Sequence, residues 1–186
     1  MRIISGSLKG KSLKFLKNST TRPLKDAVKE NIFNILQHSN NIKINFKNSN
    51  VLDLYSGIGS FGIECLSRGV KKVTFIEGSN FTSKILKENL ETLSLKKNSS
   101  VICSKIEDFL AEKKIGKFNI FFLDPPFADT NFIENLILLK KNNTYEKKHV
   151  IIIHRDAKTI DNLETYINII ITRKYGRSKI IFGSFN

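Results

Sequence analysis

One stretch of the chain places a carboxylate, two prolines and an aromatic ring at the end of an apolar run. The stretch is "FNIFFLDPPFADT", residues 118–130, in which residues 118–123 have the composition of a buried strand. Asp124 follows with no basic neighbour in the sequence, and Pro125 and Pro126 rule out a longer strand, because proline fixes φ and has no backbone N–H. A carboxylate at so rigid a corner can accept a hydrogen bond from an amine and hold that amine in place.

A second stretch, "VLDLYSGIGSFG" at residues 51–62, has the pattern of a nucleotide-binding loop. Gly57, Gly59 and Gly62 follow an apolar strand and open a helix, so the backbone can approach a ligand closely and present N–H groups to it. Glu77 comes twenty residues after Gly57, at the end of the next apolar run, where an acid can accept hydrogen bonds from ribose hydroxyls. The spacing predicts a site for a nucleoside-containing cofactor. The alternative is a glycine turn that only packs a helix on a strand.

Asp53 favours S-adenosylmethionine over a dinucleotide as that cofactor. Its carboxylate precedes the glycine loop, where a dinucleotide would place its pyrophosphate, and two like charges about 5 Å apart repel by about 3 kcal/mol at an effective dielectric constant of about 20. The sulfonium and ammonium groups of S-adenosylmethionine are instead attracted to an acid. No lysine follows the glycines, which excludes a P-loop. An NAD-dependent oxidoreductase is the alternative that Asp53 disfavours. The expected cofactor-binding residues are Asp53, Tyr55, Ser56, Gly57, Gly59, Glu77 and, through its backbone N–H beside the adenine, Ile106.

The rigid corner then suggests methyl transfer to the exocyclic amine of a base. Asp124 and the carbonyl of Pro125 can accept the two N–H bonds of the amine, which directs its lone pair toward the methyl group, and Pro126 fixes the loop. Phe127 can stack on the base, an interaction worth about 1–3 kcal/mol. These four residues are the expected catalytic residues. The alternative is an ordinary strand-terminating turn with a capping Asp and a buried Phe.

Alternating strands and helices from residue 50 onward predict an α/β fold with a parallel sheet covered on both faces. We expect strands near 51–54, 73–76, 100–103, 118–123 and 149–153, and helices near 60–68, 80–94, 106–113, 131–140 and, more weakly, 157–164. The ending "YINIIITRKYGRSKIIFGSF" predicts an antiparallel pair at one edge, and the start predicts a short hairpin followed by a helix over 24–36. Because ligands bind beyond the carboxyl ends of parallel strands, the three acids should meet in one cleft.

The net charge of +14 predicts a polyanionic partner, and it is concentrated at the start of the chain. Residues 1–50 carry ten Lys or Arg and two acids, a net charge of +8. The alternative is that the composition reflects codon usage and that the lysines are only solvated. The expected phosphate-contacting residues are Arg2, Lys9, Lys11, Lys14, Arg22, Lys25 and Lys29. Arg22 is the strongest of these candidates, because "TTRP" places it beside a rigid residue ahead of the helix.

Several other classes of protein are disfavoured. No run of about 18 apolar residues is present and the N-terminus lacks the apolar core of a signal peptide, so we expect no membrane association. Two cysteines give no disulfide framework, which fits a cytoplasmic location, and three scattered histidines predict no metal site. We interpret one of these histidines, His154, as a loop residue rather than a base.

The chain resembles the RsmD family of small-subunit ribosomal RNA guanine-N2 methyltransferases over nearly its full length. The resemblance is carried by "RIISGSLKGKSL", "TTRPLKDAVKENIFNIL", "VLDLYSGIGSFGIECLSRGVKKVTFIE" and "LDPPF". It implies a Rossmann-like, seven-stranded methyltransferase fold over 39–186, preceded by an RNA-docking extension over 1–38. It also implies methylation of one guanine of 16S rRNA, within an assembled or partly assembled small subunit, and we expect a monomer. Two departures from the family pattern are Lys105, where an Asp or Asn would meet the adenine, and His154, where an acid is expected.

Two further hypotheses stay open at this point. An adenine-N6 methyltransferase acting on DNA or another RNA would use the same D-P-P-F tetrapeptide, although the chain has no room for a separate DNA-reading domain. A noncatalytic RNA-binding module that keeps S-adenosylmethionine for structure would retain the glycine loop without using Asp124.

Overall fold

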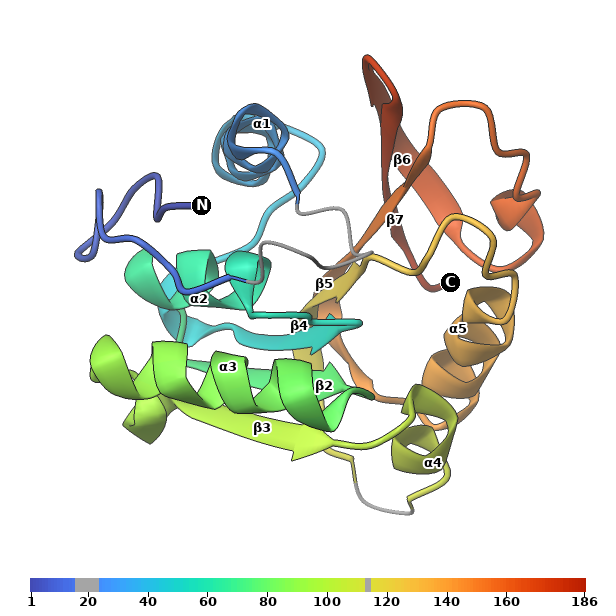
Figure 1. Ribbon diagram of the computed structural model, residues 1–186. Coiled ribbons are helices and arrows are strands. Elements are labelled where there is room, and N and C mark those ends of the chain that lie inside the picture. Colours follow the sequence, from blue (N-terminus) through green and yellow to red (C-terminus); the bar gives the residue numbers. More distant parts are fainter. Residues whose placement is uncertain (16–23, 113–114) are drawn as a thin grey trace.

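The chain folds around one seven-stranded sheet with the strand order β3-β2-β1-β4-β5-β7-β6 (Figure 1). The computed structural model describes residues 1–15, 24–112 and 115–186. Neighbours from β3 to β5 are parallel, whereas β7 pairs antiparallel with both β5 and β6. The strands are β1 (Asn50–Leu54), β2 (Lys72–Glu77), β3 (Ser99–Cys103), β4 (Phe118–Leu123), β5 (Tyr145–Asp156), β6 (Asn168–Tyr175) and β7 (Ser178–Ser184). The predicted α/β fold, its seven strands and its antiparallel edge are confirmed.

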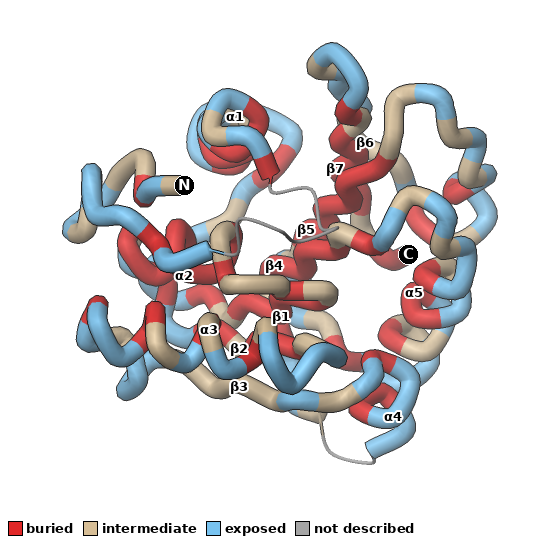
Figure 2. Tube along the Cα trace, in the orientation of Figure 1, coloured by how far each residue is buried: buried red, intermediate tan, exposed pale blue. Residues whose placement is uncertain are grey.

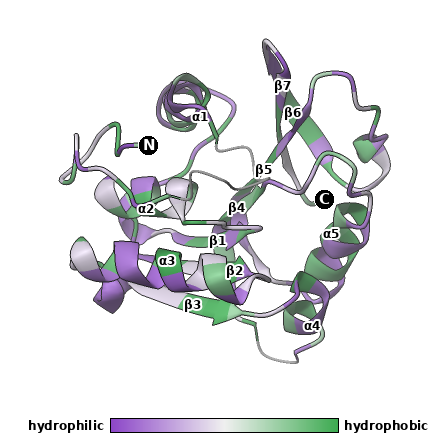
Figure 3. Cartoon of the chain, in the orientation of Figure 1, coloured by the Kyte–Doolittle hydropathy of each residue, from purple (hydrophilic) through white to green (hydrophobic). Residues whose placement is uncertain are grey.

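Helices cover both faces of the sheet, and each face has its own apolar cluster. The helices are α1 (Asp26–His38), α2 (Ser60–Ser67), α3 (Asn80–Thr92), α4 (Ile106–Leu110) and α5 (Phe132–Lys141), with 3-10 turns at Phe46–Asn48, Lys96–Asn98 and Leu163–Thr165. Apolar residues of α1, α2 and α3 pack on one face, and those of α4 and α5 pack on the other. The buried segments therefore run through the middle of the molecule (Figure 2), and the helices are mixed in hydropathy because only one side of each meets the sheet (Figure 3).

The strand register brings the functional strand ends to one edge. Leu54 of β1 pairs with Ile76 of β2 and with Leu123 of β4. The three strands therefore end side by side, so Glu77 and Asp124, which follow Ile76 and Leu123, lie on either side of the end of β1.

The N-terminal segment forms a looped arm rather than a regular hairpin. A single antiparallel bridge joins Arg2 to Ser12, and no ladder continues from it in the part that the structure describes. Gly6 lies where an added Cβ would be 1.9 Å from the carbonyl oxygen of Ser67, so the arm contacts α2 directly. Ile3 is buried with the core of the domain.

Two further elements differ from the expectation drawn from the sequence. Strand β5 continues to Asp156, three residues past the expected end, because β7 pairs with it as far as Ser178. Residues 157–164 do not form an α-helix, and only a 3-10 turn begins at Leu163; Ala157 donates its N–H to the carbonyl of Arg177, and Asn162 is left-handed, with φ 35°. Within the described ranges, no helix is long and apolar enough to cross a bilayer.

Candidate active site

Asp53 is a buried carboxylate with one oxygen unsatisfied. Its Oδ2 accepts a hydrogen bond of 2.9 Å from the N–H of Gly62, whereas Oδ1 is buried without a partner among the described residues. Burial raises the pKa of Asp53 well above its ordinary value; the Gly62 N–H opposes this shift, and the nearby charges of Asp124 and Glu77 add to it. A cationic ligand would satisfy the free oxygen. It would also favour the ionised carboxylate and so oppose the rise in the pKa of Asp53.

The glycine loop is held by Glu77 and faces open space at one residue. Glu77 accepts the N–H of Gly57 and the N–H of Ser79, each at 2.8 Å. Gly57 has φ 56°, and an added Cβ there would meet no atom within 4 Å. At Gly59 an added Cβ would instead lie 2.3 Å from Leu86 Cδ1, so this glycine is needed for packing. The loop therefore packs tightly on one side and leaves room on the other.

The other expected cofactor residues lie around this loop. Tyr55 has φ 59°, and its hydroxyl accepts a hydrogen bond of 3.0 Å from Asn135. Burial, with smaller effects of Asp129, raises the pKa of Tyr55. The N–H and hydroxyl of Ser56 both donate to the carbonyl of Ile76 at 3.0 Å, which fixes the turn.

Ile106 is buried at the start of α4, which follows β3. Its neighbour Lys105 is exposed. The expected contact of the Ile106 N–H with an adenine therefore stays a prediction.

Asp124 contacts His154, and this contact is not predicted from the sequence. Asp124 Oδ1 lies 2.8 Å from His154 Nδ1, and the Asp124 side chain is 23% exposed. His154 Nε2 lies 3.0 Å from the hydroxyl of Ser178. The interpretation of His154 as a loop residue is wrong, because β5 extends past it and buries it. Its place opposite Ile180 puts Ser178 diagonally across the strand pair, on the same face.

A buried arginine holds the rest of the tetrapeptide. Arg155 donates to the carbonyl of Pro126 at 3.0 Å and to the carbonyl of Phe127 at 3.1 Å. Asp161 accepts from its Nε and Nη2 at 3.2 and 3.0 Å. No described residue donates to the carbonyl of Pro125. The carbonyls of Pro126 and Phe127 are thus occupied. The carbonyl of Pro125, which is expected to bind the substrate amine, accepts no hydrogen bond from a described residue.

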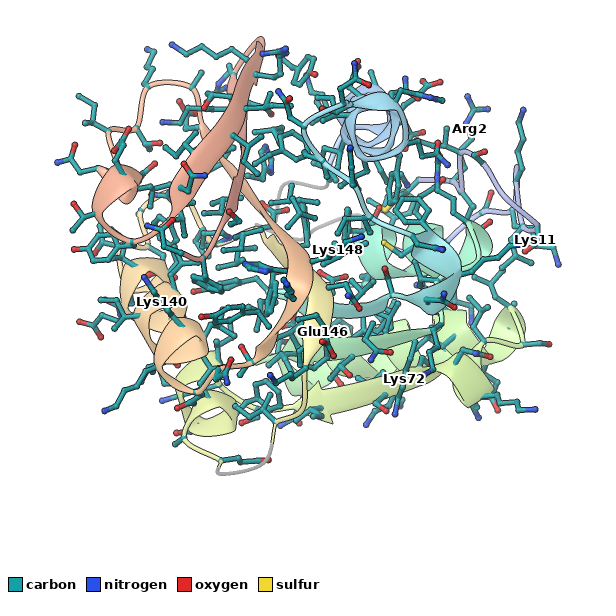
Figure 4. All side chains as sticks on the ribbon, turned by 180° about the vertical axis from the view of Figure 1, so that it is seen from behind. Arg2, Lys11, Lys72, Lys140, Glu146 and Lys148 are labelled. Carbon is teal, nitrogen blue, oxygen red and sulfur yellow. The ribbon has the colours of Figure 1, made fainter. Side chains whose placement is uncertain are left out.

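Most of the predicted RNA-contacting residues are exposed at the surface. Exposed members of the set are Arg2, Lys9, Lys11, Lys14 and Lys25. Arg2 and Lys11 lie on the N-terminal arm, far from Lys140 on α5, in the view from behind (Figure 4). Arg2 is 3.7 Å from Asp26, and Lys14 is 3.2 Å from Glu88, both as solvent-accessible pairs. Arg22 lies outside the described residues.

Lys29 is a correction to that set. Its side chain is completely buried, and its ammonium donates to the carbonyl of Arg2 at 2.9 Å and lies 3.8 Å from Glu64. Burial lowers the pKa of Lys29, and Glu64 opposes that shift. The prediction of a phosphate contact is wrong for this residue. The signal was present in the sequence, since Lys29 precedes Ile32 by three positions and so lies on the apolar stripe of α1.

A cavity of about 610 Å³ lies at the opposite edge of the sheet. Most of residues 36–49 line it together with Asn119 and Lys148, at the amino ends of β1, β4 and β5. It contains none of the residues described above and is not part of the candidate active site. In the described part of the chain, no group of three or more His, Cys, Asp or Glu could hold a metal ion.

Known proteins resemble this chain over nearly its whole length. Residues 1–184 match the family model described as conserved hypothetical protein 95. The putative rRNA methyltransferase YlbH of Bacillus subtilis is 36% identical over 176 residues, covering 94% of this chain and 92% of that protein. The ribosomal RNA small subunit methyltransferase D of Haemophilus influenzae is 38% identical over 154 residues, 82% of this chain and 76% of that protein. A solved structure, the putative methyltransferase yhhF from Escherichia coli, has a TM-score of 0.83 at 27% identity and covers 100% of this chain and 98% of that one.

Proposed function

Because the chain belongs to the conserved hypothetical protein 95 family, the RsmD family, we propose that it transfers a methyl group from S-adenosylmethionine to small-subunit ribosomal RNA. The finer assignment is to the exocyclic N2 amine of one guanine in 16S rRNA. The carboxylates of Asp53, Glu77 and Asp124 lie at the carboxyl ends of neighbouring parallel strands, and the charges of Glu77 and Asp124 raise the pKa of Asp53; this is the observation that carries the proposal.

The residues at the strand ends fit S-adenosylmethionine. The unsatisfied Oδ1 of Asp53 suits the positive charge of the ligand, and the open side of Gly57 leaves space for it. Each oxygen of Glu77 already accepts one backbone N–H and keeps a lone pair for a ribose hydroxyl. When bound, S-adenosylmethionine supplies an electrophilic methyl group. Asp53, Gly57, Glu77 and Ile106 would hold it.

The tetrapeptide would bind and orient the acceptor amine. Asp124 and the Pro125 carbonyl accept the two N–H bonds of the amine, which localises the nitrogen lone pair and stabilises the positive charge that develops there. After transfer, Asp124 or water takes the surplus proton from the cationic amine. Phe127 stacks on the base. Arg155 keeps the loop in this conformation by occupying its next two carbonyls.

The N-terminal extension, residues 1–38, would dock the RNA. Its exposed cations, beside the proposed methyltransferase domain at 39–186, would neutralise phosphates and so release counterions from the RNA. An assembled or partly assembled small subunit is the proposed substrate; relatives named ribosomal RNA small subunit methyltransferase D support the RNA of the small subunit as the target.

A methyl-transfer assay tests the proposal. Isotope-labelled S-adenosylmethionine is incubated with small subunits from cells lacking the activity, with free 16S rRNA, and with duplex DNA. We expect label in the 16S rRNA of the subunits as N2-methylguanine, and loss of at least about 10²-fold in rate for Asp124→Ala with S-adenosylmethionine binding retained. Label in N6-methyladenine or in DNA would support the alternative substrate. Transfer by Asp124→Ala at the normal rate would contradict the role of the carboxylate.

A further inference from the structure

A buried histidine connects the catalytic loop to the antiparallel edge of the sheet. His154 is 3% exposed and touches Asp124 with one ring nitrogen and Ser178 with the other, at 2.8 and 3.0 Å. Its ring also meets the ring of Phe127 edge to face, with centroids 5.8 Å apart and an interplanar angle of 82°. One side chain of β5 therefore contacts both ends of the D-P-P-F tetrapeptide.

The two partners select one tautomer of the neutral imidazole. An ionised carboxylate only accepts hydrogen bonds, so Nδ1 must carry the proton that it donates to Asp124 Oδ1. Nε2 is then an acceptor, and the hydroxyl of Ser178 can donate to it. Ser178 is 4% exposed and lies on β7, which is paired with β5 at this point, so the donor is fixed by the sheet.

This hydrogen bond leaves the other carboxylate oxygen available. None of the described residues donates to Asp124 Oδ2. A carboxylate on a loop can otherwise rotate and present either oxygen. The bond to Oδ1, from a ring held by a strand, restricts that rotation and leaves Oδ2 as the oxygen without a described donor.

We propose that His154 is a positioning residue for methyl transfer, which holds the Asp124 carboxylate so that Oδ2 accepts the substrate amine, with Ser178 fixing the required tautomer. The inference rests on the proposed function. His154 does not itself contact the reacting atoms, and it acts through Asp124. Arg155, the next residue of β5, holds the carbonyls of Pro126 and Phe127, so the end of this strand fixes both the side chain and the backbone of the loop.

A pair of variants separates positioning from simple packing. His154→Asn keeps an N–H donor close to the position of Nδ1, whereas His154→Leu fills similar volume without a donor, and both remove the ring from Phe127. We expect His154→Leu to lower kcat by on the order of 10- to 100-fold. The KM for the subunit and the Kd for S-adenosylmethionine should stay near the wild-type values, and His154→Asn should restore most of kcat. Equal losses in both variants, or none in His154→Leu, would overturn the proposal.

The imidazole tautomer gives a second test that needs no activity. Two-bond proton–nitrogen NMR spectra of the ¹⁵N-histidine protein at pH 7 to 8 should show His154 protonated at Nδ1 and unprotonated at Nε2. Protonation at Nε2 alone would overturn the proposal, because Nδ1 could then not donate to Asp124. If the wild-type protein shows this tautomer but methylates no RNA, the proposed function fails while the hydrogen-bond arrangement stands. If the wild-type protein is active and His154→Leu equally so, only the positioning role fails.

Discussion

At the scale of single residues, the site combines groups that the sequence predicts with groups that only the fold brings in. Asp53, Glu77 and Asp124 could be expected together because each ends a parallel strand, and such ends share an edge. His154 and Ser178 could not, because their contacts depend on how far β5 and β7 continue past the apolar runs. Lys29 is the converse case: its charge predicts a surface position, but it lies on the apolar stripe of α1 and is buried.

The ionisation of Asp53 leads to a prediction about stability and binding. Burial raises its folded-state pKa, so the folded protein holds the proton more tightly than the unfolded chain does. Without ligand, stability therefore falls as the pH rises from about 3.9, the ordinary value, toward the raised pKa. Asp53→Asn removes this titration. As the pH rises from 4 to 8, the Tm of Asp53→Asn should increase relative to the Tm of the wild type. S-adenosylmethionine should bind to the variant about 10- to 100-fold more weakly.

Differential scanning fluorimetry across this pH range and calorimetric titration of S-adenosylmethionine measure the two effects. The matched control is Asp108→Asn, an exposed acid of α4, which should change neither. A Tm difference between Asp53→Asn and wild type that is the same at all pH values would contradict the raised pKa.

At the scale of elements, α2 connects the N-terminal arm to the cofactor loop. Its first turn supplies the Gly62 N–H to Asp53, and its buried Glu64 accepts the N–H groups of Ile4 and Ser5 at 2.8 and 3.0 Å. Glu64 also pairs with Arg68 at 2.8 Å and with Lys29 at 3.8 Å. The alternation of strands and helices predicted α2, but no local pattern in the arm showed that its backbone would bind a carboxylate sixty residues away.

Loss of this buried charge should destabilise the protein strongly. Glu64→Gln leaves the cations of Lys29 and Arg68 without their buried counterion, and we expect a decrease of about 3–5 kcal/mol in the free energy of unfolding. Glu88→Gln removes an acid whose pair with Lys14 is exposed, at side-chain exposures of 41% and 65%, so its effect should stay below about 1 kcal/mol. Urea unfolding monitored by circular dichroism measures both. Equally small effects would show that Glu64 does not anchor the arm.

At the scale of the whole molecule, the residues that precede α1 carry a set of exposed cations. The net charge of +14 predicts a polyanionic partner, and the family of the chain makes RNA the proposed one. The exposed cations of the N-terminal side, Arg2, Lys9, Lys11 and Lys25, should contact phosphates, whereas Lys140, Lys141, Lys147 and Lys148 lie on other elements.

Neutralising the two sets separately tests this asymmetry. Changing the four N-terminal cations to Gln should weaken subunit binding and lower the slope of log affinity against log salt by about 0.7 for each phosphate that is no longer neutralised. As the control, changing Lys140, Lys141, Lys147 and Lys148 to Gln should leave the slope nearly unchanged. Filter binding of labelled subunits over a salt series supplies the slopes, and equal reductions in both variants would contradict a dedicated docking side.

Mapping the modified guanines tests the proposed methylation of 16S rRNA in cells. Ribosomal RNA from cells with and without the gene for this chain is digested, and the fragments of the small-subunit RNA are compared by mass spectrometry. We expect one N2-methylguanine of 16S rRNA that disappears with the gene and returns with the wild-type gene but not with Asp124→Ala. An unchanged set of methylated guanines in the two strains would contradict this expectation.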